Sequence, residues 1–165
     1  MTDKHAPSFV QSMDKNIFDS SKDVPPEKDI FFDSVQPGSY DLSYTCFLIP
    51  RIRSQQLIGD LADNLPKWLK EICASFDWKL EFVTINPDYF QWALWVLPTV
   101  STGHIIQQVR SKTSALIFAK FSQLKKEDES DDFWATGYLI ISGIHPDPKE
   151  VIGPYIRMTR QQQKQ

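Results

Sequence analysis

The sequence predicts an α+β fold of the ferredoxin-like, split βαβ kind: an antiparallel sheet with two helices packed on it and a further C-terminal helix. Residues 40–49 alternate between apolar and polar side chains, which is the period of a half-buried strand. Apolar residues at three- and four-residue intervals predict two amphipathic helices, in 57–76 and 101–121. Aromatic and branched residues mark the remaining strands, at 79–85, 90–97 and 137–144.

Turn and capping residues place the boundaries between these elements. Asn86, Pro87 and Asp88 predict a tight turn that joins two strands into a hairpin, and Ser101 is expected to cap the second helix. Pro66 lies inside the first helix, so we expect a kink or a break there, with Asn64 capping a second segment. An acidic loop is expected at 127–132, and a terminal helix begins at Lys149.

The chain is organised as one domain with an extension. Residues 37–165 hold the periodic patterns, whereas residues 1–36 show none and predict a flexible N-terminal extension. No segment has the length and apolarity of a membrane span, so a cytoplasmic protein without a membrane partner is expected. Cys46 and Cys73 lie far apart in apolar patterns, which favours packed free thiols over a disulfide or a zinc site.

Charge and motifs exclude several classes of function. The net charge is -3, and because the acidic excess lies in residues 1–36 the domain itself is neutral, without a general attraction for nucleic acid. No Walker loop, GxGxxG, GxSxG or HExxH motif is present. The histidines, His5, His104 and His145, share no strand or helical face, so imidazole ligation of a metal is not expected.

The centre of the chain resembles the insertion-sequence-200-like and REP-associated single-tyrosine transposases. The resemblance covers about residues 40–160 and rests on YDLSYTCFLIPRIR, on WLKEICASFDWKLEFVTINPDYFQWALWV and on VRSKTSALIFAKF. In that family a His-hydrophobic-His triplet follows the Pro-Asp turn and holds a divalent metal such as Mg²⁺. Here the triplet is Tyr89, Phe90 and Gln91, so the resemblance implies a degenerate member with no cofactor.

The resemblance also places the family's nucleophile on the terminal helix. Tyr155 stands at the matching position and is the candidate catalytic residue, vestigial without its metal. Thr159 replaces the Gln that serves the family as a further ligand, so the metal positions Tyr89, Gln91 and Thr159 are all degenerate. Gly153 and Pro154 are expected to interrupt the helix just before the tyrosine. Packing is the alternative role for Tyr155.

Nucleic-acid contacts are expected from two groups of side chains. Tyr89, Gln91 and Trp95 share one strand face by the period of two, so they could form a stacking platform for bases, although core or interface packing is the plainer explanation. The expected phosphate contacts are Arg51, Arg53, Arg110, Lys112 and Lys120, followed by Lys125 and Lys126. A solvated helix face is the alternative for these basic residues, and the acids at 127–132 would repel a nearby phosphate chain.

Three functions remain open from the sequence. The first is a transposase-like domain that is catalytically inactive, has been retained by its host, and binds hairpin or single-stranded DNA or RNA in a regulatory role. The second is a protein-interaction or assembly module that binds no nucleic acid. The third is an active DNA transposase that uses Tyr155 with other ligands, such as Asp88 or Gln91. A homodimer is expected by analogy with the family.

Overall fold

The molecule is built on a four-stranded antiparallel sheet with the strand order β2-β3-β1-β4. The computed structural model describes residues 42–127 and 129–164. The strands are β1 (Leu42–Leu48), β2 (Lys79–Asn86), β3 (Tyr89–Val96) and β4 (Leu139–Ser142). Strand β1 pairs with β3 on one side and with β4 on the other, and β2 pairs with β3. This order and orientation confirm the predicted ferredoxin-like, split βαβ fold.

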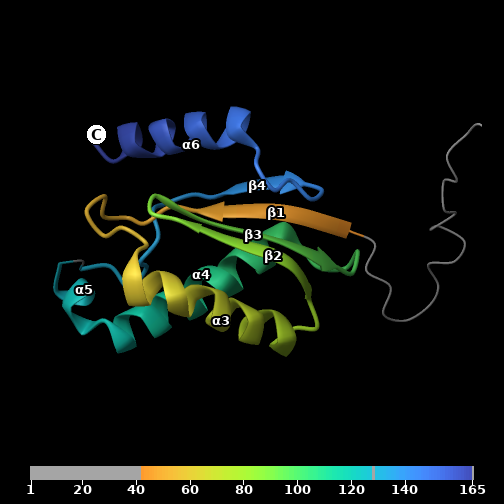
Figure 1. Cartoon of the computed structure of the whole chain (residues 1–165), viewed down its shortest axis with the longest axis horizontal. Helices are drawn as coiled ribbons and strands as arrows, with labels where there is room; N and C mark the ends of the chain where they lie inside the picture. Colours follow the sequence, from red (N-terminus) through yellow and green to blue (C-terminus); the bar gives the residue numbers. More distant parts are fainter. Residues whose placement is uncertain (1–41, 128, 165) are drawn as a thin grey trace, which may run out of the picture. The chain divides into compact units, whose positions relative to one another are not determined.

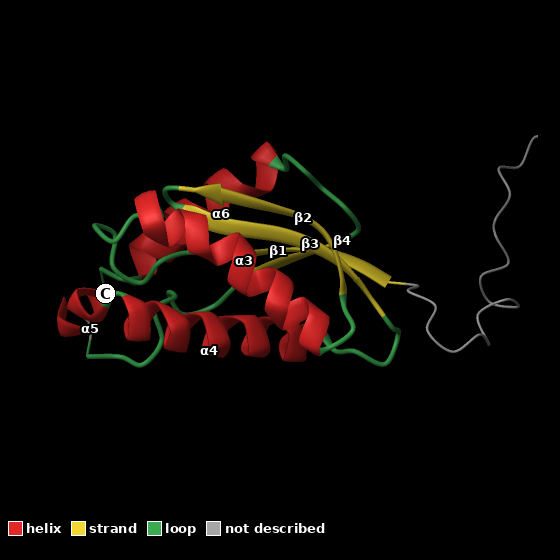
Figure 2. Ribbon diagram, turned by 60° about the horizontal axis from the view of Figure 1, so that its bottom comes forward, coloured by secondary structure: helices red, strands yellow, loops and turns green. Residues whose placement is uncertain are grey.

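The helices lie in separate layers on the two faces of the sheet. Helices α3 (Gly59–Ser75) and α4 (Thr102–Lys120) lie side by side on one face, and α5 (Ser122–Glu127) follows α4. Helix α6 (Lys149–Gln162) lies on the opposite face (Figure 1). Figure 2 shows the α3–α4 layer in front of the strands. The prediction that the two amphipathic helices cover the same face is therefore confirmed.

The core fills the space between the sheet and the α3–α4 layer. Strand β3 contributes Phe90, Trp92, Leu94 and Val96, all fully buried, because alternate side chains of a strand point to the same face. The apolar stripe of α3 meets them with Leu61, Leu65, Leu69 and Ile72. Cys46 and Cys73 join this core as free buried thiols, as predicted, and burial raises the pKa of Cys73 to about 12.

The predicted turn and cap are confirmed. Strands β2 and β3 form a hairpin closed by the pairing of Asn86 with Tyr89. The side chain of Asn86 accepts a hydrogen bond from the backbone N–H of Asp88 at 3.1 Å, which fixes the turn. The hydroxyl of Ser101 accepts from the N–H of His104 at 3.1 Å and caps α4.

Neither helix is broken at the expected position. Helix α3 continues through Pro66, and Asn64 donates back to the carbonyl of Asp60 instead of capping a new segment. Proline removes one backbone hydrogen bond, but buried residues on both sides of it hold each half of α3 against the sheet. Helix α6 likewise runs through Gly153 and Pro154, with Ile152 and Thr159 buried on either side. Tertiary packing outweighs local propensity in both helices.

Two smaller differences concern the segment before α6. The short helix α5 was not predicted, and it ends at the start of the expected acidic loop. Strand β4 is shorter than the expected segment 137–144. The expected N-terminal extension, residues 1–36, lies outside the described residues. Within the described part of the chain, no helix has the length and apolarity that crossing a membrane requires.

Candidate functional site

The outer face of β3 carries the triplet that the sequence comparison with the transposases singled out. Phe90 points into the core, so its neighbours Tyr89 and Gln91 point to the opposite face, where α6 lies. The structure therefore brings these two side chains to one face of the sheet, as the period of two predicts. Thr45 and Phe47 of β1 flank them, since Phe47 pairs with Gln91 and Thr45 with Ala93.

Gln91 is held by the backbone that leads into α6. Its side chain is 2% exposed, and its amide nitrogen donates to the carbonyl of His145 at 3.0 Å and to that of Pro146 at 3.1 Å. Both amide protons are thus used within the fold. Thr45 holds the same segment, because its hydroxyl donates to the carbonyl of Gly143 and accepts from the N–H of His145. Gln91 therefore acts as a clamp between β3 and the 143–148 segment.

Tyr89 is positioned by packing. Its ring lies 6.0 Å from the ring of Phe47, centroid to centroid, and its side chain is half-buried. Asp88, the other ligand considered for a metal, is exposed in the β2–β3 turn. Among the described residues, no group of three or more His, Cys, Asp or Glu side chains is placed to hold a metal ion. The arrangement around Tyr89 and Gln91 accordingly offers a phenol, an amide and main-chain carbonyls.

Tyr155 lies half-buried on α6, and the pKa of its phenol is raised. Burial raises the pKa of its hydroxyl, while the side chain of Thr159 and the positive charge of Arg110 act in the opposite direction. The net result is a phenol that keeps its proton at neutral pH. Thr159 is 5% exposed, and its hydroxyl donates to the carbonyl of Tyr155 at 2.9 Å. Tyr155 and Gln91 thus make their contacts with different parts of the chain.

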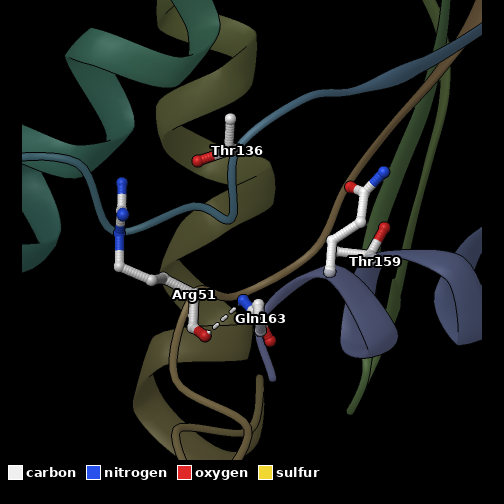
Figure 3. A pocket seen from close by; sticks show the side chains of 5 residues that line it. Arg51, Thr136, Thr159 and Gln163 are labelled. Atoms are coloured by element: carbon white, nitrogen blue, oxygen red, sulfur yellow. Dashed lines mark hydrogen bonds between the residues drawn. The ribbon is translucent and has the colours of Figure 1, made fainter. Parts of the chain in front are cut away.

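A polar hollow of about 360 Å³ lies next to Thr159. It is lined by Arg51, Thr136, Thr159, Gln162 and Gln163. Figure 3 shows Arg51 and Thr136 together with Thr159 of α6 and Gln163, the residue after the helix, around it. The side-chain amide of Gln163 donates to the carbonyl of Arg51 at 2.8 Å, which ties the end of α6 to the segment after β1.

Asp132 engages two of the predicted phosphate-binding arginines. Its carboxylate lies 2.6 Å from Nε of Arg110 and 3.9 Å from a terminal nitrogen of Arg51. Arg110 also donates to the carbonyls of Trp134, Ala135 and Gly137. Its guanidinium therefore holds the 132–137 segment in place, and most of its N–H groups already donate hydrogen bonds within the fold.

The other predicted basic residues do not form one patch. Lys112 lies over the ring of Phe76, and Lys120 donates to the side chain of Asn64, so both belong to the α3–α4 layer. Lys125 pairs with Asp131 at 2.9 Å. Arg53 lies instead on the α6 side of the sheet, close enough to Arg160 that their charges interact. The sheet thus separates the predicted phosphate contacts into two groups.

Helix α6 supplies basic residues that the sequence analysis passed over. Arg157, Arg160 and Lys164 follow one another at intervals of three and four, which places them along one side of the helix and its final turn. The pKa of Arg160 is lowered by burial first and then by Arg53, whereas Asp88 raises it. The spacing of these three basic residues at intervals of three and four could have identified them as one basic side of the helix.

Comparison with known proteins gives the family. The model described as "Transposase IS200 like" matches residues 38–159. A curated relative, the ISDra2 transposase TnpA of Deinococcus radiodurans, is 23% identical over 103 residues, which cover 62% of this chain and 74% of the relative. The match spans the sheet, both layers of helices and Tyr155. This chain therefore belongs to the IS200-like transposase family.

A solved structure supports the same fold. A protein of D. radiodurans R1 that is assigned as a transposase superposes with a TM-score of 0.66 at 21% identity, covering 75% of this chain and 95% of that one. A REP-associated tyrosine transposase bound to a REP hairpin superposes with a TM-score of 0.47 at 8% identity, covering 75% of this chain and 70% of that one. The predicted resemblance to the single-tyrosine transposases is thereby confirmed at the level of family and fold.

Proposed function

We propose that this chain is a non-catalytic member of the IS200-like family that its host retains to bind hairpin or single-stranded nucleic acid in a regulatory role. The environment of Gln91 is the observation that carries this proposal. A metal-dependent transposase needs side-chain ligands here, because the ion stabilises charge on the phosphate under attack. In this chain Nε2 of Gln91 donates to two main-chain carbonyls, at 3.0 and 3.1 Å, so the side chain is fixed in the fold and only its amide oxygen, a weak neutral ligand, is left for a cation.

The state of Tyr155 supports the loss of catalysis. A phenol attacks a phosphate efficiently only when a neighbouring base or metal removes its proton. Burial shifts the pKa of Tyr155 upward, and Thr159 stands where the family's additional ligand would be. The tyrosine is then a packing residue whose half-buried ring helps to hold α6 against the sheet.

The charges around the end of α6 support retained binding of a polyanion. Arg53 is exposed there and its charge acts on Arg160, whose own guanidinium also donates to the carbonyl of Pro50 at 2.9 Å and to the side chain of Gln163 at 2.8 Å. Arg157 and Lys164 extend the positive charge along the same helix and its last turn. This concentration of cations lies on the α6 side of a domain that is neutral overall, so phosphate contacts are proposed on this side.

The test is the binding of labelled hairpin and single-stranded DNA and RNA, measured by fluorescence anisotropy at about 50 and 200 mM salt. We expect binding that weakens steeply with salt and is the same with and without magnesium. Arg53→Gln should reduce the affinity and the salt dependence, whereas Lys112→Gln, which removes the same charge from the α3–α4 layer, should change little. Absence of binding at low salt would contradict the proposal and favour a protein-interaction module.

The oligomeric state belongs to the same proposal. By analogy with the family we propose a homodimer. Light scattering of the purified chain at micromolar concentration should give twice the mass of one chain, which is 19.1 kDa. A monomer at that concentration would contradict this part of the proposal without affecting the binding test.

A further inference from the structure

One end of the outer face of the sheet lies beyond the helix that covers the rest of it. The 143–148 segment crosses this face at Thr45 and Gln91, and α6 starts from it. Trp95 lies four residues along β3 from Gln91, which corresponds to about 13 Å of strand. Figure 1 shows the first half of β1, the strand beside Trp95, extending past the first turn of α6.

A β-bulge in the edge strand β2 places a hydrogen-bond acceptor beside Trp95. The pairing of β2 with β3 shifts between Leu80 and Phe82, so Glu81 is the extra residue of β2. The carboxylate of Glu81 accepts a hydrogen bond from the indole N–H of Trp95 at 2.9 Å. The indole N–H thereby has a hydrogen-bond partner within the chain, at the surface, and this bond favours one orientation of the half-buried ring.

Phe82 lies next to Trp95 on the same face. It pairs with Ala93, and Trp95 is two residues farther along β3, so the two aromatic side chains are diagonal neighbours across the strands. Both are half-buried, which leaves part of each ring accessible. Lys79 pairs directly with Trp95 and is exposed, so a cation stands beside the rings.

We propose that Trp95 and Phe82 form a base-stacking site for single-stranded nucleic acid on this end of the sheet, which α6 does not cover, with Glu81 as the residue that positions the indole. The proposal rests on the nucleic-acid binding proposed above and gives it a second contact, separate from the cations of α6. Four-stranded sheets bind RNA in this manner, with aromatic side chains that stack on unpaired bases. Stacking suits a domain without net positive charge, because each base has an aromatic face whatever the ionic strength.

Gln91, which the sequence had grouped with Tyr89 and Trp95, is excluded from the site because it is buried beneath the 143–148 segment. Tyr89 lies six residues from Trp95 along β3, about 20 Å, and packs on Phe47. A single nucleic-acid chain that contacts both Trp95 and the basic residues of α6 would have several nucleotides between the two contacts.

The experiment measures the affinity of the full chain and its variants for unstructured 12-nucleotide DNA and RNA at two salt concentrations. Trp95→Ala should weaken binding by about tenfold or more at both concentrations, because stacking is insensitive to salt. Trp95→Phe should retain most of the affinity. Tyr138→Ala is the matched control, since it removes another exposed aromatic side chain, 45% exposed, and should leave affinity unchanged.

The outcomes separate this site from the proposed function. If the unaltered chain binds neither oligonucleotide, the proposed function fails and this site fails with it. If the chain binds and Trp95→Ala binds equally well while remaining folded by circular dichroism, only the stacking site is overturned. A loss that disappears at high salt would also overturn it, because the contact would then be electrostatic. Comparing the affinities for the DNA and the RNA oligonucleotide shows which of the two nucleic acids the site prefers.

Discussion

Gln91 has a structural role at the position where the family resemblance places a metal ligand. The family resemblance places a metal-binding imidazole here, whereas this chain has an amide with two donors facing two main-chain carbonyls. The carbonyls of His145 and Pro146 lie in a segment of exposed and half-buried residues, and each hydrogen bond to them contributes about 0.5–1.5 kcal/mol. The amide therefore has a structural role that does not depend on metal.

Replacing Gln91 tests this role. Gln91→Met keeps the volume of the side chain and removes both donors, so we expect the free energy of unfolding to fall by about 1–3 kcal/mol. Urea unfolding measures the change. Gln107→Ala, at an exposed position of α4, is the control and should lie within about 0.5 kcal/mol of the unaltered chain. Equal stability of Gln91→Met and the unaltered chain would show that the clamp is dispensable.

Tyr155 makes a prediction about pH. Its folded-state pKa is raised above the ordinary value of about 10, chiefly by burial, so the folded chain holds the phenolic proton more tightly than the unfolded chain does. The stability contributed by the neutral phenol is therefore present below about pH 10 and is lost as pH rises through the folded pKa. The unaltered chain should lose stability relative to Tyr155→Phe across that range.

The measurement is urea unfolding of both chains from pH 8 to pH 11, together with absorbance at 295 nm to follow tyrosine ionisation. The difference spectrum between the two chains isolates Tyr155. Its ionisation below about pH 9 would mean an activated phenol and would reopen the catalytic role.

Helix α3 ends in a C-terminal capping motif that the sequence does not predict, because the usual glycine is absent. Asp77 has φ of 57°, in the left-handed region, and the N–H groups of Asp77 and Trp78 donate to the carbonyls of Ala74 and Cys73. These are the two hydrogen bonds of a Schellman motif, whose left-handed position is normally glycine. The exposed Asp77 carries a backbone conformation that favours glycine.

Asp77→Gly should therefore stabilise the protein by about 0.5–1 kcal/mol, because it removes the steric cost of a Cβ at positive φ. Thermal unfolding measures the effect. The matched control is Asp63→Gly in the interior of the same helix, where the helix propensity of glycine predicts a loss of about 0.5 kcal/mol. A loss of stability in both variants would contradict the assignment of the motif.

The sequence predicted the strands, the helices and their order, but it did not predict the features that depend on tertiary packing. The alternation of apolar and polar residues in β1 and the helical spacing of apolar residues in α3 and α4 reflect which side chains are buried. The strands, the helices and their order could therefore be inferred. The breaks expected at Pro66 and at Gly153–Pro154 rested on local propensity, which buried residues on both sides of each proline override. The roles of Arg110 and Gln91 depend on carbonyls far away in the chain, and a single sequence gives no sign of them.

At the scale of the whole molecule, the sheet separates two surfaces of different character. The α3–α4 layer covers the main core and holds Lys112 and Lys120 in contacts with α3. The opposite face carries α6 with its cations and the Trp95 end of the sheet. The acidic residue Asp131, by contrast, pairs with Lys125 after α5.

The most direct test of the account is a cleavage assay in which end-labelled hairpin and single-stranded DNA is incubated with the full chain in magnesium or manganese and resolved on a denaturing gel. We expect intact DNA and no covalent protein–DNA product, because the position of the metal-binding residues holds Tyr89 and a clamped Gln91 and the phenol of Tyr155 keeps its proton. A metal-dependent covalent product that Tyr155→Phe abolishes would contradict the account and make the chain an active transposase.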